Sequence, residues 1–392
     1  MSAKSSRTVT VTIQLEKNGF IRSNILSNII EKQERITNLV IGNEESDEID
    51  HNALRGFKLK CLESIELIGV VKKIDSNVFS ELTSLKLINI SDCNLQKLNY
   101  TAFNGLRGLI RINLNGNKLK NLDGNTFNEL TFLKYLDLSF NELGPSLDLN
   151  TFNGLFSLET LNLTSNKLDN MNADSLSKIL SLKNLFLTAN EIATVDFYSF
   201  KKLKKLERLD LGKNGYLTSI KNSFKSDVIA LKSLKFLNLE SCNFKNIEKN
   251  MFIGLNELLS LNLSQNKISS IEAYSFIKLN NLLELNLNDN IIEIINSKSL
   301  IGLTRLESLY IENNQIETIE YNSFRYFGSL KELNLKKNKI TSFDELIMDG
   351  MINLVSFLAD QNQLSSFNSR NNFNKLTELE VLSIKICYNF SS

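Results

Sequence analysis

The chain has 392 residues with 45 basic and 44 acidic side chains, so its formal charge at neutral pH is +1. A balance this even excludes a global field that would favour nucleic acid or an anionic membrane, so partners must be selected by local surfaces. Apolar residues make up 42% of the chain along its whole length, which argues against long disorder. No apolar run approaches the roughly 18 residues that span a bilayer, so no membrane span is expected.

Residues 1–35 differ from everything that follows and are expected to form an N-terminal cap. Met1 to Arg7 is polar, and as written the sequence begins without a secretory signal. From Val9 to Leu15 apolar residues alternate with polar ones, which predicts a strand, and Asn18-Gly19 predicts a turn. Apolar residues between Ile25 and Ile30 then recur at helical spacing. A strand, turn and helix here would cover the apolar edge of the first coil.

From residue 36 to residue 392 one sequence repeat recurs about 15 times, with a degenerate first copy and an incomplete last one. Nine of the thirteen intervals between the clear copies are 24 residues long, and the others are 23, 25, 28 and 25. The 28-residue copy is expected to carry its extra residues after Phe224. Each clear copy opens with a leucine: Leu62, Leu85, Leu109, Leu133, Leu158, Leu182, Leu206, Leu234, Leu258, Leu282, Leu306, Leu330, Leu354 and Leu379.

Within each copy, apolar residues at positions 1, 4 and 6 suit a short strand whose inward side chains stack on the next coil. A single coil would leave that face in water, and stacking buries it. Position 9 carries an amide, which can satisfy backbone groups in the turn that ends the strand. These amides are Asn117, Asn141, Asn166, Asn190, Asn214, Asn266, Asn290, Asn314, Asn338 and Asn362. A phenylalanine near position 19 is expected to form a spine on the outer side: Phe79, Phe103, Phe127, Phe152, Phe200, Phe224, Phe252, Phe276, Phe324 and Phe373.

The pattern LxxLxLxxNxLxxIxxxxFxxLxx resembles the leucine-rich-repeat family in its typical 24-residue subtype, over roughly residues 62–392. The resemblance implies an α/β repeat solenoid, with a curved parallel β-sheet on the concave face and loops and short helical turns on the convex face. It also implies recognition of a protein or another ligand. The typical subtype is most familiar from extracellular and receptor ectodomain proteins. Many such members have cysteine-rich end caps, which this chain does not contain.

Neither cysteine nor histidine usage predicts a catalytic or metal site. Cys93, Cys242 and Cys387 stand at position 9 of their copies, about six coils apart, which is far beyond the roughly 7 Å between Cα atoms that a disulfide allows. We expect structural thiols there, while the role of Cys61 is open. His51 is the only histidine, so neither a zinc site nor a catalytic triad can be assembled convincingly. No phosphate-binding glycine loop occurs, and no enzymatic activity, cofactor or metal is expected.

Positions 2, 3, 5, 7 and 8 are expected to point outward from the strands and to form the binding face. Most of them are polar, so the large aromatics Tyr135, Phe140 and Phe186 are candidate ligand-binding residues within three adjacent coils, with Phe236 and Tyr310 as more distant candidates. Isolated exposed aromatics without a function are also common. Five glycosylation tripeptides would be acceptors if the protein is secreted, at Asn89, Asn99, Asn162, Asn262 and Asn389.

Two settings remain open for this binding scaffold. The first is an extracellular or cell-surface domain for adhesion, signalling or innate immune recognition, with a protein or other macromolecular ligand and no nucleic acid. The alternative is an intracellular adaptor or regulatory subunit, which the missing signal, the missing cysteine caps and the free thiols favour. No cap is visible after the last strand before Ser392, and either a truncated chain or an uncovered last coil would account for this.

Overall fold

The computed structural model describes residues 10–15, 36–49, 54, 59–170, 175–221, 231–343, 347–348, 350–365 and 375–385. The chain divides into two compact units, Met1–Glu191 and Ile192–Ser392. His51, Phe224, Phe373, Cys387 and Asn389 lie outside the described residues, as do the expected helix of the cap and the segment that follows Phe224.

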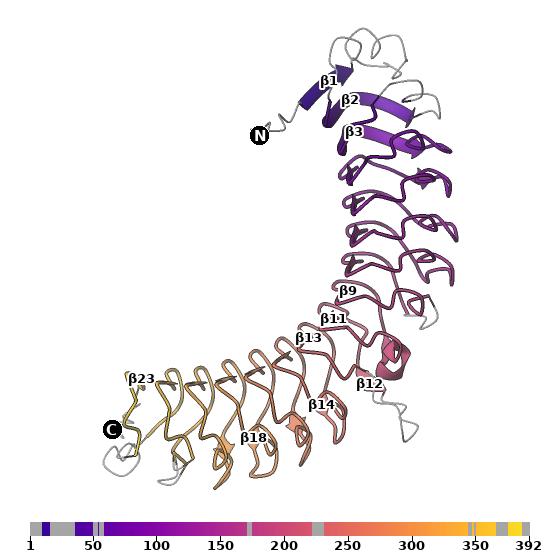
Figure 1. Cartoon of the computed structure of the whole chain (residues 1–392). Helices are drawn as coiled ribbons and strands as arrows, with labels where there is room; N and C mark the ends of the chain where they lie inside the picture. Colours follow the sequence, from indigo (N-terminus) through magenta and orange to yellow (C-terminus); the bar gives the residue numbers. More distant parts are fainter. Residues whose placement is uncertain are drawn as a thin grey trace, which may run out of the picture. The chain divides into compact units, whose positions relative to one another are not determined.

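The first unit is a stack of coils joined in a parallel sheet (Figure 1), to which the coil that opens at Leu85 contributes two strands. Its first three strands have 6, 12 and 11 residues, and the later strands span only two or three. The strands are β1 (Thr10–Leu15), β2 (Asn38–Ile49), β3 (Ser64–Ile74), β4 (Leu87–Asn89), β5 (Lys97–Leu98), β6 (Arg111–Asn113), β7 (Tyr135–Asp137), β8 (Thr160–Asn162) and β9 (Asn184–Phe186). β1 pairs with β2 and β2 with β3, and the ladder then runs through β4, β6, β7, β8 and β9.

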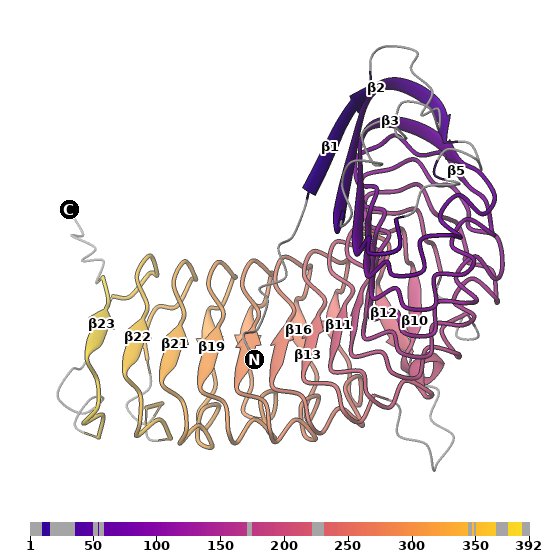
Figure 2. The ribbon, with the colours of Figure 1, turned by 45° about the horizontal axis from the view of Figure 1, so that its top comes forward.

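The second unit repeats this plan, and its strands lie side by side in Figure 2. The main ladder contains β11 (Arg208–Asp210), β13 (Phe236–Asn238), β15 (Ser260–Asn262), β17 (Glu284–Asn286), β19 (Ser308–Tyr310), β21 (Glu332–Asn334), β22 (Ser356–Leu358) and β23 (Val381–Ser383). Short strands later in six of the described coils form separate two-stranded sheets. These strands are β10 (Thr194–Asp196) with β12 (Ser219–Lys221), β14 (Asn246–Ile247) with β16 (Ser270–Ile271), and β18 (Ile294–Ile295) with β20 (Thr318–Ile319).

Each coil buries its apolar positions between its neighbours. In the copy that opens at Leu258, the side chains of Leu258, Leu261 and Leu263 are fully buried. In β15 the burial pattern places Leu261 inward between the half-buried Ser260 and Asn262. The β2–β3 pair has one register shift, between Asn43 and Ser46, and the short strands of the main ladder pair without a shift from one coil to the next, for example Leu237 with Leu261 and Leu261 with Leu285. Constant register places equivalent outward residues in straight rows, which positions the candidate site.

The amides at position 9 form the expected buried ladder. Asn266 donates from Nδ2 to the carbonyls of Leu239, Leu263 and Ser264 at 2.8, 3.0 and 3.1 Å, and its Oδ1 accepts from the Phe244 N–H at 3.2 Å. The same pattern recurs at Asn141, where the amide bonds the carbonyls of Leu114 and Leu138. Because each amide bridges two coils, the ladder satisfies buried backbone groups that neither coil could satisfy alone.

The outer side of the coils confirms the phenylalanine spine but not the helical turns. Phe79 stacks on Phe103 with ring centroids 6.1 Å apart, and Phe252 stacks on Phe276 at 5.8 Å. The expectation of short helical turns is wrong for nearly all of the described chain. One 3-10 helix, Phe197–Phe200, is described, and the other outer segments are turns and short strands. A chain that needs only to connect one strand to the next over a spine of rings can do so without a helix.

The thiols at position 9 are free and buried, as expected for Cys93 and Cys242. At Cys242, a cysteine replaces asparagine where the usual backbone donor of the preceding coil is already engaged. Before Cys242, the Leu217 N–H that would serve it donates to the Asn214 carbonyl at 2.9 Å instead, because the exposed Tyr216 adds one residue to that turn. Before Cys93, the equivalent residues lie within β3, whose backbone pairs with β2. A thiol needs only an acceptor, and Cys242 Sγ finds one in the Leu211 carbonyl.

Candidate functional site

The outward positions of the main-ladder strands and of the turns that follow them form one surface in each unit, which we call the strand face. At position 2, lysines and glutamates of neighbouring coils pair across the strands. Glu159 accepts from both Lys134 and Lys183, at 3.5 and 2.8 Å, in the first unit. In the second unit, Lys235 pairs with Glu207 at 3.1 Å and Lys331 with Glu307 at 2.7 Å. These exposed pairs neutralise one another, so this row presents little unmatched charge to a ligand.

Position 5 carries a second polar row that sequence reasoning missed. In eight coils the side-chain oxygen of an Asn or Asp here accepts the N–H two residues later at 2.9 to 3.1 Å, whereas Asn89 Oδ1 accepts none from the described residues; the eight are Asn113, Asp137, Asn162, Asp210, Asn238, Asn262, Asn286 and Asn334. Position 5 points outward as expected, but it is not free to vary in these coils, because its side chain closes the turn. The recurrence of Asn or Asp five residues into each copy was the available signal.

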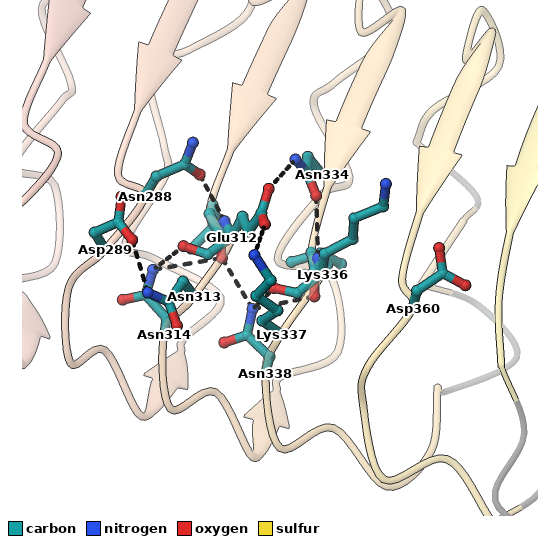
Figure 3. Close-up of polar contacts among 12 residues, drawn as sticks. Asn288, Asp289, Glu312, Asn313, Asn314, Asn334, Lys336, Lys337, Asn338 and Asp360 are labelled. Carbon is teal, nitrogen blue, oxygen red and sulfur yellow. Dashed lines mark hydrogen bonds and ion pairs between the residues drawn. The ribbon is translucent and has the colours of Figure 1, made fainter.

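Phe186 and Tyr310 interrupt this row with aromatic rings. In the coil of Tyr310, the Glu312 N–H donates to Asn288 Oδ1 of the preceding coil at 2.6 Å, so the lost acceptor is replaced. Figure 3 shows this contact, together with Glu312 accepting from Asn334 Nδ2 at 3.0 Å and Lys337 Nζ at 2.7 Å. In the coil of Phe186, the equivalent N–H of Thr188 has no side-chain acceptor in the described part of the chain. The loss of the position-5 acceptor therefore costs more folding free energy at Phe186 than at Tyr310.

Position 8 has a left-handed backbone in one coil after another. Short polar or small side chains occupy it in seven coils, such as Gly116, Ser165 and Asn313 at φ values of 69°, 55° and 56°, and an unbranched Lys or Gln occupies it in four. Phe140 adopts the same conformation at φ 52° with 57% of its side chain exposed. A bulky residue is disfavoured at positive φ, and an exposed ring gains little from burial, so folding alone does not explain Phe140.

Tyr135 belongs to a polar network in the first unit. Its hydroxyl donates to Asp137 Oδ2 at 2.9 Å, and Asp137 also accepts from Asn162 Nδ2 and from both the N–H and the hydroxyl of Ser139. Burial, together with the hydrogen bond to Asp137, raises the pKa of Tyr135 to about 12. Tyr310 is similar, because burial and its hydrogen bond to Glu332 raise its pKa. Both rings are half-buried, and their hydroxyls are engaged with the protein.

The structure does not gather Tyr135, Phe140 and Phe186 into one cluster of rings. They occupy positions 3, 8 and 5 on the coils of β7 and β9, with Thr160 and Asn162 of β8 between Tyr135 and Phe186. No ring contact joins the three, all of which are described. Their use in binding remains a proposal.

The more distant aromatics instead border a hollow on the strand face of the second unit. The hollow has a volume of about 250 Å³, and Phe236 lines it. Tyr310 lies one strand beyond it, in register with the lining residue Asn286. The lining residues come from β11, β13, β15 and β17: Arg208, Leu209, Asp210, Phe236, Leu237, Asn238, Ser260, Asn262, Glu284 and Asn286.

Two arginines on the strand face lie against aromatic rings of the next coil. The guanidinium of Arg208 is 4.3 Å from the centre of the Phe236 ring, and that of Arg111 is 5.6 Å from the Tyr135 ring. Neither has a carboxylate within ion-pair distance in the described part of the chain, unlike the lysines at position 2. Arg111 and Arg208, both at position 3 of their copies, thus present positive charge that the protein itself leaves unmatched.

The candidate glycosylation asparagines differ in how their amide nitrogens are engaged. The nitrogen donates to Glu66 at 2.9 Å in Asn89, to Asp137 at 3.2 Å in Asn162 and to Glu240 at 3.4 Å in Asn262. In Asn99 only the oxygen is engaged, accepting from the N–H and hydroxyl of Thr101 at 2.9 Å each. Asn99 therefore has the least encumbered amide among the four described candidates.

The described residues contain no group of three or more His, Cys, Asp or Glu side chains arranged to hold a metal ion. No helix within the described ranges has the length and apolar character needed to cross a bilayer.

A leucine rich repeat family model matches residues 83–143, 180–244, 232–292, 262–316 and 304–364, which together make up more than half of the chain. The chain belongs to the leucine-rich repeat family. No curated protein matches this leucine-rich repeat chain by sequence.

Solved structures of other leucine-rich repeat proteins share its fold. A TLR13 complex with the single-stranded RNA ssRNA13 matches with a TM-score of 0.77 and 24% identity, over 96% of this chain and 58% of that one. The glycosylated Toll–Spatzle complex of Drosophila matches with a TM-score of 0.78 and 20% identity, over 94% of this chain and 50% of that one. The LRIM1/APL1C complex matches with a TM-score of 0.68 and 18% identity, over 87% and 61%. The chain thus spans about half to three fifths of these chains.

Proposed function

We propose that this leucine-rich repeat protein is a non-catalytic recognition scaffold that binds a protein or another macromolecule through its strand face, in an extracellular or cell-surface setting. The observation that carries the proposal is the placement of Phe140 at a left-handed position that favours glycine or asparagine, and of Phe186 at position 5, where an Asn or Asp side chain closes the turn in eight other coils. Both rings are retained on a solvent-facing surface at a cost to folding, which is typical of residues kept for binding. The Toll–Spatzle and LRIM1/APL1C structures are complexes of proteins that share this fold.

The test uses Phe140→Asn/Phe186→Asn, which should restore the favoured residue at both positions without harming the fold. A partner captured by the wild-type protein from its native source is purified, and its Kd is measured against both proteins. We expect binding to weaken at least tenfold, about 1.4 kcal/mol. The control is Phe132→Ser/Phe156→Ser, which removes two rings that are 63% and 60% exposed but lie outside the strand face. Loss of binding in the control alone would place the binding surface elsewhere.

The intracellular alternative is supported by the free thiols, since Cys61, Cys93 and Cys242 are all unpaired. Glycosylation separates the two settings. Mass spectrometry of native material should find a glycan on Asn99 if the protein is secreted, and the other described candidates should be modified less because their amides are engaged. Unmodified peptides at every tripeptide would support the intracellular setting.

RNA is the other ligand class to separate from a protein. The even charge balance of the chain favours a protein ligand. The TLR13 structure, however, holds single-stranded RNA on the same fold. Nucleic acid is therefore included as a competing ligand in the experiment below.

A further inference from the structure

The hollow in the second unit exists because a small side chain stands between large ones. Arg208, Phe236, Ser260 and Glu284 occupy position 3 of β11, β13, β15 and β17 and are register partners in sequence across the sheet. Ser260 leaves space between the Phe236 ring on one side and the Glu284 side chain on the other. The hollow therefore runs across the strands and has a different charge at each end.

The positive end is the Arg208 guanidinium. It is half-buried over the Phe236 ring, and no carboxylate pairs with it in the described part of the chain. The ring orients the planar group and reduces its contact with water, while its N–H donors at the edge stay available. A guanidinium held in this way is suited to bind a carboxylate of a ligand.

The negative end is the Glu284 carboxylate. Its side chain is exposed, and no cation of the described residues pairs with it. At position 2 of the same strands stand Leu259 and Leu283, so the row of lysine–glutamate pairs is interrupted beside the hollow. Glu284 thus presents a charge that a basic group of a ligand would match.

The floor between the two ends is polar. Asn238 donates from Nδ2 to Asp210 Oδ1 at 3.0 Å, and Asn262 donates to Glu240 at 3.4 Å, so both amides are held in place. Asn286 Oδ1 accepts from the Asn288 N–H at 3.0 Å, while its Nδ2 has no hydrogen-bond acceptor in the described part of the chain. That free donor suits a peptide carbonyl passing over it.

We propose that this hollow binds an extended segment of a protein partner that crosses the strands, with an acidic side chain at Arg208 and a basic one at Glu284. The proposal rests on the function proposed above. Arg208 and Glu284 are three strand spacings apart, about 14 Å. In an extended peptide, side chains at i and i+4 share a face and are separated by about 13 Å. The carboxylates of Asp210 and Glu284 beside a single arginine make the same hollow unfavourable for a phosphate backbone.

The experiment measures binding of three blocked pentapeptides by ligand-observed NMR. They are acetyl-Glu-Ser-Ala-Ser-Lys-amide, the same peptide with Lys at both ends, and the same peptide with Glu at both ends. The wild-type protein should bind the Glu/Lys peptide at least fivefold more tightly than either like-charged peptide. Arg208→Glu should reverse the preference toward the Lys/Lys peptide, and Glu284→Lys should reverse it toward the Glu/Glu peptide.

Matched controls are Arg325→Glu and Glu293→Lys, two exposed positions of the same unit outside the strand face. Both should keep the wild-type order of peptides, and all variants should keep the wild-type melting temperature within about 2 °C, since no buried group changes. Equal binding of the three peptides by the wild-type protein would overturn the proposal, as would an unchanged order in Arg208→Glu.

A single-stranded oligoribonucleotide is also tested as a competitor. If it displaces the Glu/Lys peptide and binds more tightly than any of the three peptides, the peptide proposal is overturned in favour of RNA. If the three peptides bind equally but Phe140→Asn/Phe186→Asn still weakens binding of the captured partner, the hollow is not the peptide site and the proposed function stands. Failure of that aromatic variant, with the expected peptide order, would instead relocate binding to the second unit.

Discussion

Single residues on the strand face carry two kinds of information, one about the backbone and one about a ligand. At position 5, Asn238 and Asn262 are explained by the turn that each one closes. At position 8, Ser165 and Asn313 are explained by a left-handed backbone. Residues that do not suit these local demands, such as Phe140 and Phe186, are the ones whose presence requires a reason other than folding.

Phe140→Asn is expected to stabilise the protein. Asparagine tolerates the left-handed backbone better than phenylalanine, so the free energy of unfolding should rise by about 0.5–1 kcal/mol in urea titrations. Ala189→Asn, at the same position two coils later with φ 54°, is the control and should also stabilise while removing no ring. A loss of stability in Phe140→Asn alone would mean that the half of the ring in contact with the protein contributes more than the backbone costs.

At the scale of the element, much of the coil could be predicted from the sequence. The leucines, the amides of position 9 and the phenylalanine spine recur at fixed spacing because stacking imposes the same environment on every coil. The scarcity of helical turns in the described outer segments could not be predicted, because a connecting segment of ten or so residues satisfies the same pattern as a turn or as a helix. The role of the second polar row was not predicted, because polar asparagines are ordinary on a face that was already expected to be polar.

The hollow could not be foreseen for a different reason. Each of its members reads as an ordinary outward residue in its own copy of the pattern, and only register across four strands brings Arg208, Ser260 and Glu284 into one row. The missing ion pair of Arg208 is likewise visible only in three dimensions, because Glu207 precedes it directly in the sequence and pairs with Lys235 instead.

Alanine variants of Asn266, in the buried ladder, and Asn286, in the outer row, compare what the two rows contribute to stability. Asn266→Ala removes four hydrogen bonds, two of which join neighbouring coils, and leaves buried carbonyl and N–H groups without partners, so the free energy of unfolding should fall by about 2–4 kcal/mol. Asn286→Ala removes one hydrogen bond at a half-buried position, where water can replace it, and should cost less than about 1 kcal/mol. Equal losses in chemical denaturation would show that the outer row is structurally as important as the ladder.

The stability of the whole molecule should depend on pH through its buried thiols. Burial, assisted by the negative charges of Asp92 and Glu66, raises the pKa of Cys93 to about 12, and burial likewise raises that of Cys242 to about 12. The unfolded chain releases these protons near pH 9, while the folded chain retains them. Stability from these groups is therefore complete below pH 9 and is lost between pH 9 and pH 12, at about 1 kcal/mol for each thiol by pH 10.

The measurement is urea unfolding at pH 8 and pH 10 in the presence of reductant. Cys93→Ser/Cys242→Ser should lose less stability over this interval than the wild-type protein, because serine does not titrate there. The same loss in both proteins would assign the alkaline sensitivity to other groups. Tyr135, with its pKa raised to about 12, loses its contribution to stability mainly above its ordinary pKa of 10. It therefore adds to the loss of stability at still higher pH.

Constant register has a consequence for how such a surface can change over generations. Because Arg208 and Glu284 are held apart by whole coils of 24 to 28 residues, the distance between them is quantised. Deleting or duplicating one complete copy would move them by one step of about 4.8 Å and leave every remaining coil with intact neighbours. A gain or loss of whole repeats in the gene would therefore change, in fixed steps, the length of the ligand that fits between the two charged residues.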